Sequence, residues 1–119
     1  STLVYSLIEG ISFGLFDNYQ ALSKTGIKLN NLFVIGGGSK NEDWIKLLAS
    51  ILDRDLAITE ASDAMAAYGA ARLAYLGYNN LKHEDVLRSP SVKKIIEKDN
   101  SMSPILQDRF AQWKNYYVK

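Results

Sequence analysis

Residues 32–44 constrain the fold of this chain most, because they combine a buried strand, a glycine turn and a helix start. Residues 32–35, Leu-Phe-Val-Ile, form a continuous apolar run, which is typical of a strand buried on both faces. Three glycines, 36–38, follow at once, and Ser39 with Glu42 matches the Ser-x-x-Glu capping box of a helix N-terminus. We therefore predict a strand, a turn and a helix.

This turn suits a loop that contacts a nucleotide or a phosphate. Glycines lack the Cβ atom that keeps a ligand away from the backbone, and a helix start offers unpaired N–H groups at a positive dipole end. A tight connection without any ligand fits equally well. No P-loop motif is present, and in the Rossmann pattern Gly36 and Gly38 fit while Asn41 replaces the third glycine.

Composition removes several classes of function. The net charge of +1 gives no reason to expect nucleic acid as a partner. The lack of cysteine excludes disulfides and favours a reducing, cytoplasmic compartment, and a single histidine, His83, excludes a multi-histidine metal site. No apolar run approaches the ~20 residues that span a membrane. The 119 residues do not begin with Met, and we expect a piece of a larger domain.

The elements that we expect alternate between helix and strand. Helices are predicted at residues 2–23, 40–52, from Ser62 or Asp63 to Leu76, and 103–119, and a second strand at 56–59. Gly26 and Gly77 are the predicted helix stops. Residues 78–102 are predicted to be rich in loops, with short helical turns at 84–87 and 92–98. The class is therefore α/β, with two short parallel strands flanked by helices.

Three helix faces carry further predictions. The first helix has one apolar stripe: Val4, Ile8, Ile11, Leu15, Tyr19 and Leu22. The second helix has the stripe Trp44, Leu47, Leu48 and Ile51, and the last has Leu106, Phe110, Trp113 and Tyr117, which we expect to pack in the core. The third helix has a face of small residues, which suits either a neighbouring helix or a flat ligand such as an adenine ring.

With these pieces placed, the sequence resembles the C-terminal end of FGGY-family carbohydrate kinases, most of all their xylulokinase members. The motif Leu-Phe-Val-Ile-Gly-Gly-Gly-Ser-Lys-Asn-Glu-Asp-Trp at 32–44 carries the resemblance, together with Tyr-Gly-Ala-Ala-Arg-Leu-Ala at 68–74. Ser-Leu-Ile-Glu at 6–9 is similar to the end of another family signature, in which Leu7 is a departure. The similarity covers residues 3–77.

The resemblance implies an actin-like, ribonuclease-H-like ATPase fold in two domains. Residues 1–119 would be the closing half of the second domain, which binds the nucleotide. ATP with Mg²⁺ would lie across the interdomain cleft, its phosphates at Gly37 and Gly38 and its adenine near Asn41 or Glu42. The implied cofactor-binding residues are Gly36, Gly37, Gly38, Ser39, Asn41 and Glu42.

No catalytic residue is expected in this chain, because the family's catalytic aspartate and the contacts to a sugar such as D-xylulose lie elsewhere in the parent kinase. The isolated chain is therefore expected to be inactive, and it is expected to form a homodimer that covers exposed sheet edges.

Two other interpretations remain open at this stage. The first is a Rossmann half-domain, in which Glu60 at the end of the second strand would hold a ribose. The second is a helical interaction module without enzymatic activity, built on the aromatic stripe of the last helix.

Overall fold

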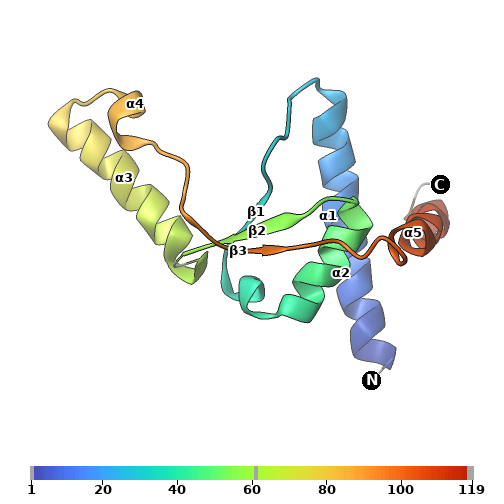
Figure 1. Cartoon of the computed structure of the whole chain (residues 1–119). Coiled ribbons are helices and arrows are strands. Elements are labelled where there is room, and N and C mark those ends of the chain that lie inside the picture. The colour runs from blue at the N-terminus through green and yellow to red at the C-terminus, as the bar shows by residue number, and fades with distance from the viewer. Residues whose placement is uncertain (1, 61, 118–119) are drawn as a thin grey trace.

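The computed structural model describes residues 2–60 and 62–117, and it has a small sheet with helices packed on one side (Figure 1). The helices are α1 (Thr2–Lys24), α2 (Glu42–Leu52), α3 (Met65–Asn79), α4 (His83–Val86) and α5 (Ser103–Tyr117). The strands are β1 (Phe33–Val34), β2 (Leu56–Thr59) and β3 (Val92–Ile96). Two 3₁₀ turns, η1 (Gly37–Lys40) and η2 (Ser62–Ala64), precede α2 and α3.

The sheet has the order β1-β2-β3 and is mixed. β1 and β2 are parallel, with Val34 opposite Ile58, and α2 connects them, as the sequence predicts. β3 is antiparallel to β2, with Leu56 opposite Ile96, so the prediction of a helical turn at 92–98 is wrong. Only Ile96 of this edge strand is buried. Because the other positions need not be apolar, the sequence of β3 does not show the apolar alternation that indicates a strand.

The first core lies between α2 and the sheet. Ile45, Leu48 and Ala49 of α2 pack against apolar residues of β2 and β3. The predicted stripe of α2 is partly wrong, because Ile45 is buried while Trp44 is only half-buried. The Trp44 indole Nε1–H instead donates to Ser12 Oγ of α1 at 2.9 Å, and a half-buried position lets its polar N–H find this partner.

The second core joins α1, α2 and α5. Phe110 of α5 lies edge-on to Phe16 of α1, with ring centroids 4.6 Å apart, and it also contacts Phe13 at 5.7 Å. Leu106 of α5 and Ile51 of α2 complete this cluster and have no exposed surface. Leu106 and Phe110 of the α5 stripe are thus buried in the core. The hypothesis of a helical interaction module, which needs this stripe to be free for a partner, is therefore discarded. The side chain of Tyr117 lies outside the described part of the structure.

The buried face of α1 differs from the predicted one. Its buried residues are Glu9, Ser12, Phe13 and Phe16. Four members of the predicted stripe, Val4, Ile11, Leu15 and Leu22, are 46–55% exposed. Apolar residues occur on both sides of this helix, and periodicity alone does not tell which side a neighbour covers.

Helix α3 projects from the sheet on the side away from α1 and α5 (Figure 1), and none of its residues is buried. Its N-cap is Ala64 without a side-chain hydrogen bond, so the predicted caps Ser62 and Asp63 are wrong. The predicted stop at Gly77 is wrong, because Gly77 lies within the helix. The helix ends at Asn79, and its C-cap Asn80 has the left-handed conformation with a φ of 50°. Asparagine tolerates this conformation, so it serves as the stop in place of glycine. The small residues of this face are exposed, apart from the half-buried Gly69.

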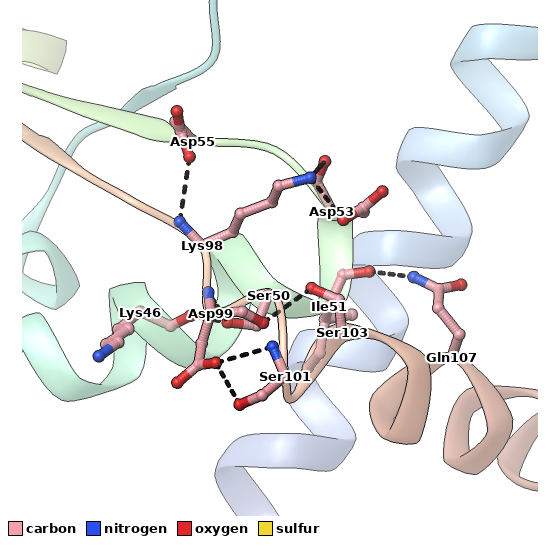
Figure 2. Close-up of polar contacts among 10 residues, drawn as sticks. All are labelled: Lys46, Ser50, Ile51, Asp53, Asp55, Lys98, Asp99, Ser101, Ser103 and Gln107. Atoms are coloured by element: carbon pink, nitrogen blue, oxygen red, sulfur yellow. Dashed lines mark hydrogen bonds and ion pairs between the residues drawn. The ribbon is translucent and has the colours of Figure 1, made fainter.

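Polar contacts fix the segment between β3 and α5 to the C-terminal end of α2 (Figure 2). Lys98 Nζ pairs with Asp53 Oδ1 at 2.8 Å, and the Lys98 N–H donates to Asp55 Oδ1 at 3.0 Å. The hydrogen bond from Lys98 also holds the pKa of Asp53 below its usual range. The Asp99 N–H donates to Ser50 Oγ at 2.9 Å. These contacts place α5 against α1 and α2.

A buried carboxylate joins α1 to α5. Glu9 is 5% exposed, and its Oε2 accepts from Arg109 Nη2 at 2.7 Å. Burial raises the pKa of Glu9, while Arg109 and the Tyr5 hydroxyl act in the opposite direction. Burial disfavours the charged form, so the folded state binds a proton at Glu9 more tightly than the unfolded state does.

We expect a pH dependence of stability from Glu9. Because its folded pKa is raised, its contribution is complete below the unfolded value of about 4.3 and is lost as the pH rises through the folded value. Relative to the Glu9→Gln variant, the wild-type free energy of unfolding should therefore fall between pH 4 and 7. Urea unfolding of both proteins at each pH measures this difference. A difference that stays constant over this range contradicts the prediction.

Candidate functional site

The glycine loop leaves β1 in a conformation that requires glycine. Gly36 has φ 87° and ψ 179°, and its N–H donates to Ser62 O at 2.7 Å. This region of backbone space is almost restricted to glycine. A Cβ atom on Gly36 or Gly37 would have no atom within 4 Å, so the main chain is bare at both residues. The first N–H groups of a helical turn have no partner within it, which leaves η1 with donors for a ligand.

Gly38 has a structural role instead. A Cβ atom there would lie 2.9 Å from Cζ3 of Trp44, so the missing side chain makes room for the indole ring. Of the three glycines, Gly36 and Gly37 are open to a ligand, and Gly38 lies under a side chain of this chain.

The predicted capping box is wrong, because the η1 turn separates the glycines from α2. Ser39 Oγ donates to Gly36 O at 2.7 Å and lies 2.6 Å from Ser62 Oγ, so Ser39 ties the loop after β1 to the loop after β2. The N-cap of α2 is Asn41, whose Oδ1 accepts from the Trp44 N–H at 3.1 Å. The Asn41 Nδ2 group has no partner among the described residues.

Two ion pairs neutralise acids beside the loop. Both carboxylate oxygens of Glu42 contact Lys94 Nζ, at 2.6 and 2.7 Å, and Lys40 Nζ lies 2.9 Å from Asp63 Oδ2. Sequence reasoning missed Lys94, because its segment was predicted to be helical. The Lys94 charge removes the repulsion that Glu42 alone would exert on a phosphate nearby.

A cavity of about 340 Å³ lies beside the loop at the carboxyl ends of β1 and β2, a common place for ligands in α/β proteins. It is lined by Ser39, Lys40, Glu42, Ile58, Thr59, Ser62, Asp63, Lys93 and Lys94. Only some of the predicted site residues line this cavity. Ser39 and Glu42 line this cavity, whereas Gly36, Gly37, Gly38 and Asn41 do not.

Other predicted features concern metals, membranes and His83. Within residues 2–60 and 62–117, no three His, Cys, Asp or Glu side chains form a group that could hold a metal ion. No helix in the same part of the chain has the length and hydrophobicity to cross a membrane. The side chain of His83 is 76% exposed, so this histidine lies on the surface.

Residues 1–78 match the model of the C-terminal domain of the FGGY family of carbohydrate kinases. The chain belongs to this family. The xylulose kinase of Escherichia coli K12 is 35% identical to this chain over 77 residues, which are 65% of this chain and 16% of that protein. An L-fuculokinase of Escherichia coli O157:H7 is 31% identical over 83 residues, 69% of this chain and 17% of that protein.

Two solved structures are similar in fold over nearly all of this chain. A xyloylose kinase from Brucella ovis matches 98% of this chain with a TM-score of 0.85 and 28% identity, and the match covers 24% of that protein. A xylulose kinase from Rhodospirillum rubrum matches 93% with a TM-score of 0.72 and 21% identity. The fold is therefore part of the actin-like ATPase fold of sugar kinases, as predicted, and the Rossmann interpretation is discarded.

Proposed function

We propose that this chain is the nucleotide-contacting, C-terminal portion of the second domain of a carbohydrate kinase. The kinase would transfer a phosphoryl group from ATP to a sugar such as xylulose in the cytoplasm. The observation that carries the proposal is the bare main chain at Gly36 and Gly37, where a ligand can approach the loop and the Gly37 N–H. The Gly36 N–H already donates to Ser62 O. Family membership and the xylulose kinase relatives support the reaction class.

In this proposal the phosphates lie against Gly36 and Gly37, and the adenine side lies toward Ser39, Asn41 and Glu42. Asn41 offers its Nδ2 group, because its Oδ1 already accepts from the Trp44 N–H. Gly38 contributes by accommodating Trp44 and so fixing the start of α2. These residues bind and orient, as phosphoryl transfer requires, and ATP supplies the transferred group. The described residues do not fit a magnesium site, so Mg²⁺ would be held by the phosphates and by other parts of the kinase.

The proposal is tested by adding ADP to the chain and following backbone amide resonances by NMR. We expect shifts centred on Gly36 and Gly37. The Gly37→Val variant should weaken ADP binding at least tenfold, because its side chain fills the space above the amides. Gly77→Val, at an equally open glycine of α3, is the matched control and should bind ADP as the wild type does. Shifts confined to α3, or equal losses in both variants, would overturn the proposal.

We expect the isolated chain to lack kinase activity and to self-associate. It contains no group that we propose as a catalytic base, and the exposed apolar residues of α1, among them Leu3 and Leu7, favour a homodimer. A coupled assay with ATP and xylulose should show no turnover, and light scattering should show a mass above 13.3 kDa that rises with concentration. Measurable turnover contradicts the first expectation, and a constant monomeric mass contradicts the second.

A further inference from the structure

The cavity beside the glycine loop contains a buried hydroxyl that the nucleotide proposal does not use. Thr59, the last residue of β2, lines the cavity and is 1% exposed. Its Oγ1 atom has no hydrogen-bond partner among the described residues. Buried hydroxyls are rarely left unsatisfied, because they lose their hydrogen bonds to water on folding. The hydrogen-bonding capacity of this hydroxyl is therefore unused within the described part of the structure.

A β-bulge brings two lysines of β3 to the same cavity. Ile58 lies opposite Lys94 and Thr59 lies opposite Val92, so Lys93 is an extra residue between these pairs. Successive side chains of a regular strand point to opposite faces, and a bulge re-aims one of them. As a result, Lys93 and Lys94 both line the cavity.

The charges of the cavity wall favour an anion. The two acids that line it are already paired, Glu42 with Lys94 and Asp63 with Lys40. Lys93 has no ion pair among the described residues, which leaves one uncompensated positive charge. The start of α2, where Glu42 lies, adds the positive end of a helix dipole.

We propose that this cavity binds a phosphate-class anion, with Lys93 supplying the positive charge and Thr59 Oγ1 donating a hydrogen bond. The anion is either free phosphate or a phosphate group of a nucleotide. A volume of about 340 Å³ holds a phosphate group together with several waters. The proposal does not depend on a nucleotide at Gly36 and Gly37, because none of the three glycines lines the cavity.

The test is titration of the chain with inorganic phosphate at constant ionic strength, followed by amide NMR. Lys93→Met and Thr59→Val should each weaken phosphate binding about tenfold, the effect of one hydrogen bond to a charged group. Lys28→Met removes an exposed lysine elsewhere and should change nothing. Thr59→Val removes no protein hydrogen bond, so its unfolding midpoint in urea should equal or exceed that of the wild type.

Failure of the wild type to bind phosphate, or equal weakening by Lys28→Met, overturns the proposal. A second titration with ADP separates the sources of the anion. If ADP displaces phosphate from the wild type but not from Lys93→Met, the site belongs to a nucleotide phosphate. If ADP and phosphate bind at the same time, the site belongs to free phosphate. Phosphate binding that persists without any ADP effect at Gly36 and Gly37 leaves this proposal intact and removes only the nucleotide proposal.

Discussion

Replacing Phe110 by alanine is expected to lower the free energy of unfolding by about 3–5 kcal/mol. Phe110 is 5% exposed and contacts Phe13 and Phe16 of α1 and Trp113 of its own helix. The variant loses the transfer free energy of the ring and leaves a cavity between two helices that cannot close fully. Because domains of this size have total stabilities of about 5–15 kcal/mol, this loss is a large fraction of the total. Urea denaturation followed by circular dichroism measures the loss.

Tyr116→Ala is the matched control for Phe110→Ala. Tyr116 lies on the same helix but is 86% exposed, so its truncation should change the free energy of unfolding by no more than about 0.5 kcal/mol. Equal losses in the two variants would mean that α5 does not pack on α1 as the structure has it.

The second large effect is expected at Gly36, where alanine should cost about 1–3 kcal/mol of stability. The reason is conformational, since the φ of 87° is unfavourable for any residue with a Cβ atom although the space around it is empty. The loop would shift to relieve this strain, and the hydrogen bond from the Gly36 N–H to Ser62 O would be disturbed. The midpoint of urea unfolding measures the cost.

Gly37→Ala provides a control of opposite sign one residue away. Gly37 has no positive φ and equally empty surroundings, and it begins a helical turn. Alanine reduces the conformational entropy of the unfolded chain, so this variant should gain up to about 1 kcal/mol. A change of the same sign in both variants would contradict the backbone conformation described for the loop.

Local patterns predicted the elements whose signal lies within a few residues. The run Leu-Ala-Ile-Thr is β2 over the predicted residues, and Gly26, the predicted stop of α1, has a φ of 83°. Each of these signals depends on side-chain shape or backbone freedom at the position itself. The family motif at 32–44 likewise located the glycine loop and its place after a parallel strand.

Predictions failed where one segment depends on a distant one. β3 is a strand because β2 offers it an edge, and its own sequence, with Lys93 and Lys94 in the middle, carries no apolar alternation. The N-cap of α2 is Asn41 and not the predicted Ser39, because the Ser39 hydroxyl hydrogen-bonds to Ser62, 23 positions away. The ion pair of Glu42 with Lys94 spans 52 positions and follows from the placement of β3.

The sequence by itself therefore determined the α/β class, the parallel pair of strands and the glycine turn between β1 and α2. The tertiary structure decided which face of α1 is buried, which glycines are bare and which charges meet at the carboxyl ends of the strands. The physical reason is the range of the interactions. Backbone preference and periodicity act within one element, whereas burial and ion pairing depend on neighbours that only the fold brings together.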